Sequence, residues 1–321
     1  LDGRSGTLRR APGGERRLLR HFDRPPGRLA KRLEPRLARR LPIGSVWGRR
    51  AGDWLIDIEP SWHGPQPRTE LLPTIRAAGV ATAAVVPDLL PIRHPEWFPE
   101  SSVERFVAWL HAHRSVGSRW IAISHATAAD LTDWLGDDAD VAVLRLGVDR
   151  VSRDPRPNRS SLPGRGLLLM IGTVEPRKGH GLVLDALDEL GSRAPTIDVV
   201  GSAGWAADVL LDRLEHHPRI RWHQSISDTD LEELLSRTSL LLQPSFGEGF
   251  GLPVAEALAR GIPVLASDLP VLDEAAKGAA ELIESSGWAS ALDRFVTDES
   301  FGNDLRQRAK AFEPWSWADT G

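Results

Sequence analysis

Residues 240–257 read LLLQPSFGEGFGLPVAEA, and this stretch gives the clearest indication of how the chain folds. It begins with an apolar run, 240–243, that is typical of a buried strand. A turn with three glycines follows, and Pro253 suits the first turn of the helix that comes next. A strand joined to a helix by a short turn is the repeating unit of parallel α/β sheets. Gly249 and Gly251 also allow the backbone to approach a ligand closely.

A second strand–turn–helix unit lies upstream, where an apolar strand at 167–171 leads into GTVEPRKG at 172–179 and a helix at 180–190. Turns at the carboxyl ends of parallel strands bind anions, because free N–H groups and the helix dipole both favour negative charge there. Arg177 and Lys178 add two positive charges, and Arg can hold a phosphate with two parallel hydrogen bonds. A solvated basic turn is the alternative interpretation of the same residues.

Apolar strands alternate with amphipathic helices through most of the chain, which favours parallel sheets with crossover helices. Further strands are expected at 54–58, 80–86, 120–124, 141–146, 197–201, 220–223, 263–267 and 279–283. The polar segment 151–165, rich in Pro, Ser and Arg, is expected to be a linker. The sequence therefore predicts a basic segment at 1–50, an N-terminal α/β domain at 51–150, this linker and a C-terminal α/β domain at 166–321.

The composition excludes several other kinds of site. The 321 residues include no cysteine, so disulfides, Cys-ligated zinc and a Cys nucleophile are ruled out. No apolar run in the sequence reaches eighteen residues, the length of a candidate transmembrane helix. The Asp-x-Asp pairs at 138–140 and 228–230 are not expected to bind a metal, because the first precedes its strand and the second is typical of a helix start.

Residues 1–50 carry fourteen Arg and one Lys against four acidic residues, whereas the whole chain has a formal net charge of −4. This asymmetry predicts either a poorly ordered Arg-rich stretch or a peripheral contact with an anionic membrane. Nucleic-acid binding is not expected, because the basic residues are not interleaved with aromatic side chains. The segment has no glycine-rich strand–turn–helix unit and the chain lacks an initiating Met, so we expect an N-terminally incomplete chain.

Two glutamates flank the second half of the glycine-rich turn. Glu248 lies in the turn and Glu256 just inside the following helix, with seven residues between them. Carboxylates accept hydrogen bonds from the paired hydroxyls that a sugar and a ribose both offer. A lone Glu in a first helical turn is usually only a partner of the helix dipole, so the pairing is the informative feature.

Residues 171–276 resemble the donor domain of glycosyltransferase family 4. Glu248 and Glu256 match the paired-glutamate motif of that family, and GTVEPRK at 172–178 looks like the donor-phosphate loop of its bacterial mannosyltransferase-like branch. GIPVLAS at 261–267 is similar to the segment that usually follows, and the resemblance extends upstream to about residue 51. It implies the GT-B fold, in which two Rossmann-like parallel-sheet domains face each other across a cleft.

The resemblance also implies roles for individual residues. Arg177 and Lys178 would neutralise the donor diphosphate as it leaves, and Glu256 would bind the ribose. Glu248 would hold the transferred sugar together with the backbone N–H groups of Phe250 and Gly251. The remaining donor-binding residues would come from the two turns: Gly172, Thr173, Gly249 and Leu252. Enzymes of this family retain the anomeric configuration and typically need no divalent metal, because protein cations replace the Lewis acid.

Two positions depart from the family pattern. Thr173 stands where many members have an Arg, and Arg177 is expected to take over that role. Pro87, followed by Asp88, stands where many members have a His that contacts the transferred sugar. The candidates for the acceptor side are Asp88, His125 and Trp62.

The resemblance thus implies an enzyme that moves a hexose, with mannose as the first candidate, from a nucleoside-diphosphate sugar to a glycan or lipid-linked glycan in polysaccharide biosynthesis. We expect no cofactor, no nucleic-acid partner, and a cytoplasmic location with peripheral contact at the inner membrane face. Two alternatives stay open. One is a GT-B epimerase or phosphorylase that uses the same donor site, and the other is a degenerate relative that binds nucleotide or a partner without transfer.

Overall fold

The computed structural model describes residues 53–58, 68–136, 139–148 and 166–319. The predictions for the basic segment 1–50, for Trp62 and for the linker 151–165 lie outside the described residues. By its internal contacts the chain divides into two compact units. The described part of the small unit is 53–58, 68–85 and 104–120, and that of the large unit is 86–103, 121–136, 139–148 and 166–319. The predicted domain boundaries differ from this division and stay predictions.

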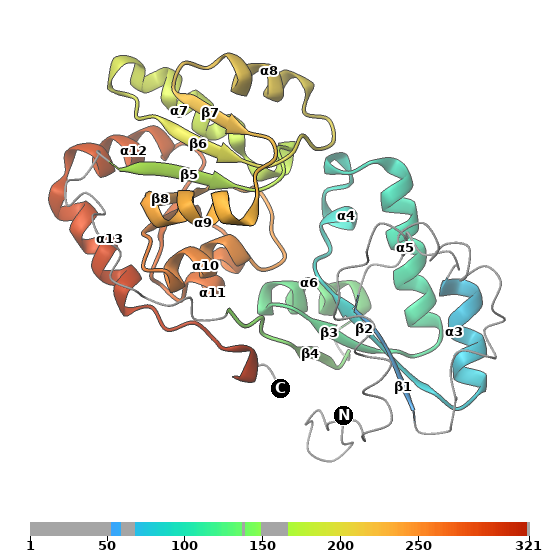
Figure 1. Cartoon of the computed structure of the whole chain (residues 1–321). Coiled ribbons are helices and arrows are strands. Elements are labelled where there is room, and N and C mark those ends of the chain that lie inside the picture. The colour runs from blue at the N-terminus through green and yellow to red at the C-terminus, as the bar shows by residue number, and fades with distance from the viewer. Residues whose placement is uncertain (1–52, 59–67, 137–138, 149–165, 320–321) are drawn as a thin grey trace. The chain divides into compact units, whose positions relative to one another are not determined.

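A four-stranded sheet in the order β1-β2-β3-β4 occupies the N-terminal part of the chain (Figure 1). Its strands are β1 (Trp54–Asp57), β2 (Ala81–Val86), β3 (Arg119–Ala122) and β4 (Val141–Val143). β1 and β2 pair in parallel, and the crossover between them is α3 (Arg68–Ala77). The other helices of this region are α4 (Leu90–Arg93), a 3₁₀ turn (Pro95–Trp97), α5 (Glu100–Ser115) and α6 (His125–Leu135).

The small unit contains a buried polar network around the carboxyl end of β1. Asp57 Oδ2 accepts hydrogen bonds from Arg68 Nε at 2.6 Å and Trp109 Nε1 at 3.2 Å, and lies 3.1 Å from His113 Nε2. His113 Nδ1 lies 2.9 Å from Ser118 Oγ, so the network continues into the turn before β3. Although burial opposes ionisation, the hydrogen bonds from His113, Arg68 and Trp109 and the charge of Arg68 hold the pKa of Asp57 well below its usual value.

The large unit is built on a six-stranded sheet in the order β10-β9-β8-β5-β6-β7, in which each pair of neighbouring strands is parallel. The strands are β5 (Leu167–Ile171), β6 (Ile197–Val200), β7 (Ile220–His223), β8 (Thr238–Gln243), β9 (Val264–Ser267) and β10 (Glu281–Ile283). Each expected strand of this half is present, and the ends differ by at most two residues. The alternation of apolar runs and helices therefore predicted this sheet correctly.

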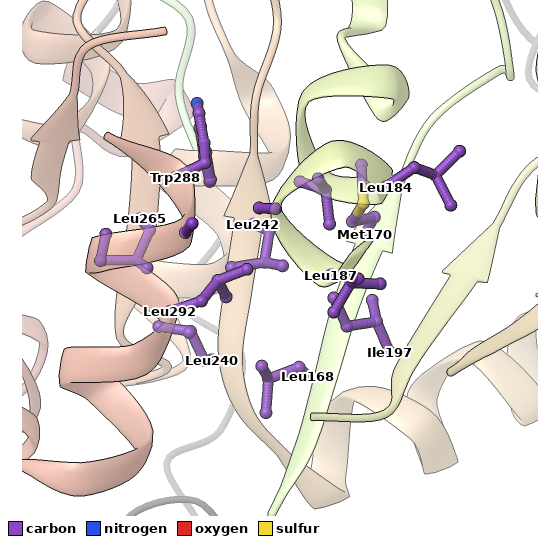
Figure 2. Packing of buried hydrophobic residues seen from close by; sticks show 14 of the residues in the cluster. Leu168, Met170, Leu184, Leu187, Ile197, Leu240, Leu242, Leu265, Trp288 and Leu292 are labelled. Carbon is purple, nitrogen blue, oxygen red and sulfur yellow. The ribbon is translucent and has the colours of Figure 1, made fainter. Parts of the chain in front are cut away.

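Helices cover both faces of the six-stranded sheet. Because strand side chains alternate between faces, Leu168 and Met170 pack into one core, whereas Leu169 packs into the other. The first core also receives α7 (His180–Leu190), α8 (Asp208–His216), α12 (Trp288–Thr297) and most of α13 (Glu299–Ala311). Figure 2 shows Leu184 and Leu187 of α7 and Trp288 and Leu292 of α12 in this core. The second core receives α9 (Asp228–Arg237), α10 (Leu252–Ala259) and α11 (Pro270–Ala276).

The order of the strands places the two glycine-rich turns side by side. The chain moves outward from β5 through β6 and β7, and then returns to β8 on the other flank of β5. The reversal of strand order between β5 and β8 is a topological switch point, and ligands of open α/β sheets bind beyond the carboxyl ends of the strands there. The turns after β5 and β8 are the turns that the sequence singled out. Within the described residues, no helix is long and apolar enough to cross a membrane.

Candidate active site

The turn after β5 is fixed by backbone hydrogen bonds and by one crowded glycine. Gly172 N–H donates to Val200 O at 2.9 Å, and Val174 N–H donates to Ser202 O at 2.9 Å, which attaches the turn to the end of β6. A single 3₁₀ turn, Pro176–Lys178, then leads to Gly179, whose φ of 67° is left-handed. A Cβ atom at Gly179 would lie 1.8 Å from Pro244 O. Only glycine therefore fits where the two turns meet.

The turn after β8 lies directly against the turn after β5. Phe246 N–H donates to Arg177 O at 2.8 Å, which joins the two turns through their backbones. The second turn ends at Gly251, whose φ of 96° again requires a left-handed backbone, and α10 begins at the next residue. Among the described residues, no acceptor is found for the N–H groups of Phe250 and Gly251. These two groups are the backbone donors expected to hold the transferred sugar.

Glu248 is the centre of a compact ionic cluster. Its Oε1 atom lies 2.7 Å from Lys178 Nζ, 2.7 Å from Ser245 Oγ and 2.8 Å from Gln243 Nε2. Its Oε2 atom lies 3.7 Å from Arg177 Nη1, which is an ion-pair distance without a hydrogen bond. The structure thus brings together the three residues predicted to be catalytic, Glu248, Arg177 and Lys178. It adds two polar residues that the sequence analysis did not select.

Arg177 is held by three oxygen atoms from the same two turns. Its Nε atom lies 2.7 Å from Glu175 Oε1, and its Nη1 atom donates to Gly247 O at 3.3 Å and pairs with Glu248. Arg177 and Lys178 are therefore both neutralised by glutamates, and neither side chain extends freely into solvent. An anionic ligand that binds here would compete with Glu175 and Glu248 for the two cations.

Glu256 has a different environment from Glu248. It lies on α10 with its side chain exposed, whereas the Glu248 side chain is only 9% exposed. Leu252 is exposed as well, but Phe250 is buried in the second core. Phe250 can therefore serve a ligand only through its backbone, as predicted. The ligand contacts of Glu256 and Leu252 stay predictions.

Asp88 lies at the carboxyl end of β2 and belongs to the large unit. Its Oδ1 atom accepts a hydrogen bond from Leu90 N at 3.0 Å, which starts the short helix α4. The pKa of Asp88 is raised, mainly because the carboxyl group is buried and to a smaller extent because Glu248 is negatively charged. The hydrogen bond from Leu90 N–H and the charges of Arg177 and Lys178 act in the opposite direction, but they do not outweigh burial. The role of Asp88 on the acceptor side stays a prediction.

The segment that carries Asp88 also touches the second turn. A Cβ atom at Gly249 would lie 2.2 Å from Pro87 O, so glycine is required for this close approach. Thr127 Oγ1 lies 3.3 Å from both Pro87 O and Gly249 O. The large unit therefore joins the end of β2, the start of α6 and the Glu248 turn at one place.

His125 is exposed and engaged by a residue that the sequence analysis did not single out. Its Nδ1 atom lies 2.8 Å from Glu274 Oε1 of α11, and the same carboxylate accepts the N–H groups of His125 and Ala126. Glu274 thus neutralises the start of α6. His180, which follows the first turn, is buried, and burial together with Lys178 lowers its pKa to about 4. It is neutral at pH 7 and adds no charge to the site.

Gln243 and Ser245 are the main site residues that sequence reasoning missed. The available signal was a polar side chain at the end of an otherwise apolar strand, since Gln243 follows three leucines. In the described parts of the chain, no group of three His, Asp or Glu residues is arranged to hold a metal ion. Asp228 and Asp230 begin α9, where Ser227 and Asp230 form a capping box, so this pair has the structural role expected of it. Independence from metal stays a prediction.

Comparison with known proteins identifies what this chain is similar to. Residues 153–312, just under half of the sequence, match the family model described as glycosyl transferases group 1. The solved structure of Alr3699/HepE from Anabaena, in complex with UDP and glucose, superimposes with a TM-score of 0.60 at 17% identity, over 94% of this chain and 84% of that one. The predicted α/β GT-B fold is confirmed, and the C-terminal half is similar to a glycosyltransferase domain.

Two curated relatives are more specific. The chain is 34% identical over 226 residues to the serotype-specific mannosyltransferase WbdA of Escherichia coli. The aligned region covers 63% of this chain and 28% of WbdA. It is 29% identical over 232 residues to O-antigen chain mannosyltransferase B of Escherichia coli, over 68% of this chain and 60% of that protein. The chain thus spans less than a third of WbdA and less than two thirds of the second relative.

Proposed function

We propose that this chain is a retaining glycosyltransferase that moves a hexose from a nucleoside-diphosphate sugar to a glycan or lipid-linked glycan. Mannose is the first candidate for the hexose, because both curated relatives are named mannosyltransferases. The pathway would be the synthesis of a surface polysaccharide at the cytoplasmic face of a membrane. The observation that carries the proposal is the pairing of two basic residues with Glu248 at the switch point between β5 and β8.

The donor diphosphate would bind over the first turn. Charge builds up on the leaving diphosphate when the glycosidic bond breaks, and preorganised cations are most effective where charge develops. Arg177 and Lys178 come from a turn that is fixed to β6 and to the second turn, so both are held in place before the ligand arrives. Thr173 would offer its backbone N–H group beside them, whereas Gly172 would contribute only the shape of the turn, because its own N–H is donated to Val200 O. The two cations would take the place of a divalent metal.

The sugar and the ribose would be held by the second turn and by α10. Glu248 and the free N–H groups of Phe250 and Gly251 supply an acceptor and two donors within four residues, which suits the hydroxyl groups of a hexose. The exposed carboxylate of Glu256 would accept the ribose hydroxyls. Asp88, which follows Pro87 at the end of β2, would face the transferred sugar. His125 and Trp62 would belong to the acceptor side.

Thermal stabilisation by a panel of ligands tests the proposal. A ligand that binds only the folded chain raises the melting temperature according to its concentration relative to its dissociation constant. The panel contains GDP, UDP, ADP and TDP with their mannose or glucose conjugates. We expect one nucleotide to stabilise the chain, and its sugar conjugate to stabilise it further. The absence of any shift with every member of the panel would contradict the proposal.

Product analysis separates the alternatives. A transferase consumes the sugar nucleotide and lengthens an added acceptor, whereas an epimerase changes the sugar nucleotide without an acceptor. A phosphorylase would need inorganic phosphate to release a sugar phosphate from a glycan. A degenerate relative would bind nucleotide and give none of these products.

A further inference from the structure

We infer that Gln243 and Ser245 are positioning residues that hold one oxygen of Glu248 and so assign its other oxygen to the sugar of the donor. This inference rests on the proposed function, because it specifies how the site presents its carboxylate to the ligand. Both residues are almost completely buried, with exposed fractions of 2% for Gln243 and 0% for Ser245. Neither side chain can reach solvent, and Gln243 Nε2 and Ser245 Oγ both lie against Glu248.

The hydrogen bonds of these residues have one consistent direction. Gln243 Nε2 donates to Ser245 Oγ at 2.9 Å and to Glu248 Oε1 at 2.8 Å, and Ser245 Oγ donates to Glu248 Oε1 at 2.7 Å. The opposite orientation of the Gln243 amide would place its oxygen against the carboxylate. The amide nitrogen therefore faces Glu248, and Ser245 must use its hydrogen for the same carboxylate.

Oε1 of Glu248 is saturated by this arrangement. A carboxylate has about four lone-pair sites on its two oxygens, and three donors already share Oε1: Lys178, Gln243 and Ser245. Among the described residues, no group donates a hydrogen bond to Oε2, whose ion-pair partner Arg177 is 3.7 Å away. The acceptor capacity that remains for a sugar hydroxyl is therefore on Oε2.

The two neutral donors also explain how Glu248 can stay in place when the donor binds. Lys178 is paired with Glu248 in this structure, and the proposed function requires its ammonium group to contact a phosphate. If Lys178 were the only partner, its movement toward the ligand would leave a nearly buried carboxylate without hydrogen bonds. Such a group would rotate toward solvent, because unsatisfied buried charges are unfavourable. Gln243 and Ser245 come from β8 and its end, so they do not move with Lys178.

Two substitutions that keep side-chain volume nearly constant test the inference. Gln243→Met and Ser245→Ala, alone and together, remove the neutral donors and leave Lys178 in place. The matched control is Thr238→Val, which also removes a buried hydroxyl group. Thr238 begins β8, at the end of the strand away from Gln243, and its hydroxyl donates to Leu234 O. Ser245→Thr keeps the hydroxyl and serves as the conservative rescue.

The readouts are calorimetric affinities for GDP and GDP-mannose, with UDP and UDP-glucose run in parallel, and the rate of sugar transfer. We expect the double variant to bind the nucleoside diphosphate within about threefold of wild type, while kcat falls about 10- to 100-fold through lost hydrogen bonds to a charged group. The extra affinity that the sugar gives should be lost as well. Thr238→Val and Ser245→Thr should retain both properties. Unchanged kcat in a folded double variant, or an equal loss of affinity for GDP and GDP-mannose, would overturn the inference.

Ligand-free crystal structures of Lys178→Met, alone and combined with the double substitution, decide the inference even if no sugar nucleotide binds. We expect the Glu248 carboxylate to keep its wild-type position in Lys178→Met, where Gln243 and Ser245 still donate to it, and to leave that position in the combined variant. A carboxylate that stays in place in the combined variant would overturn the positioning role. A wild-type chain that binds no nucleotide contradicts the proposed function instead. The two failures are therefore distinguishable.

Discussion

Substitution of Gly179 by alanine should destabilise the chain, because the two turns of the candidate site leave no room for a Cβ atom at this position. Gly179 has a left-handed backbone with φ 67° and ψ 19°, and an added Cβ would lie 1.8 Å from Pro244 O and 2.7 Å from Pro244 C. The left-handed conformation costs an alanine about 1–2 kcal/mol. Because the obstructing atoms are backbone, no rotamer change relieves the overlap, and overpacking of this kind adds about 1–3 kcal/mol. We expect Gly179→Ala to lower the free energy of unfolding by about 2–5 kcal/mol.

Gly278→Ala provides a matched control. Gly278 also has a positive φ, 75°, but a Cβ added there would meet no atom within 4 Å. Its substitution should cost only the conformational penalty of about 1–2 kcal/mol. Guanidinium unfolding measures the loss of unfolding free energy in each variant. The extra loss in Gly179→Ala reports the overlap between the added Cβ atom and the second turn. Displacement of the first turn should also shift Lys178 away from Glu248. In the absence of denaturant, Gly179→Ala should therefore weaken nucleotide binding, whereas Gly278→Ala should not. Equal losses of stability in the two variants would refute this reasoning.

Three other substitutions have distinct expected results. Glu256→Ala removes an exposed side chain, so the unfolding free energy should change by less than about 0.5 kcal/mol. Calorimetry should nevertheless show a loss of nucleoside diphosphate affinity of at least about tenfold. Full affinity would exclude the ribose contact. Lys178→Met keeps the aliphatic stem but not the charge, so it should weaken GDP or UDP binding and leave binding of the phosphate-free nucleoside unaltered; equal effects on both ligands would argue against a phosphate contact. His180 has a pKa of about 4 in the folded chain against 6.5 as its ordinary value, so the unfolded chain takes up the proton first. Stability should therefore fall by up to about 3 kcal/mol as the pH is lowered from 6.5 to 4, and His180→Gln should remove this part of the slope in pH-dependent unfolding.

The C-terminal sheet was predictable from the sequence because the apolar runs of its strands, the residues that bound them and the apolar faces of the helices all indicate the same elements. Apolar runs such as 167–171 and 197–200 are bounded by glycine or proline, and the helices between them have a regular apolar face. The short helix α4 was missed, since four residues are too few to show a helical period. The N-terminal buried network was missed for a different reason. Asp57, His113 and Ser118 are separated by many residues, and no local pattern connects them.

The candidate site was predictable where its residues share a turn. Arg177 and Lys178, and likewise Glu248 and the glycines around it, are neighbours in the sequence, so the spacing alone placed them on one turn. The sequence did not show that β5 and β8 are adjacent, and it therefore could not reveal the ion pair between Lys178 and Glu248. The buried donors Gln243 and Ser245 and the partner of His125, Glu274, depend on the same tertiary contacts.

The most direct test of the central claim follows the reaction itself. The purified chain is incubated with GDP-α-mannose and a mannose oligosaccharide, and with the other sugar nucleotides of the panel in parallel, while proton NMR monitors the anomeric signals. We expect that one donor is consumed, that the acceptor is lengthened with retained α configuration, and that Lys178→Met abolishes the reaction. A β-linked product, or no consumption of any donor by the folded chain, would contradict it.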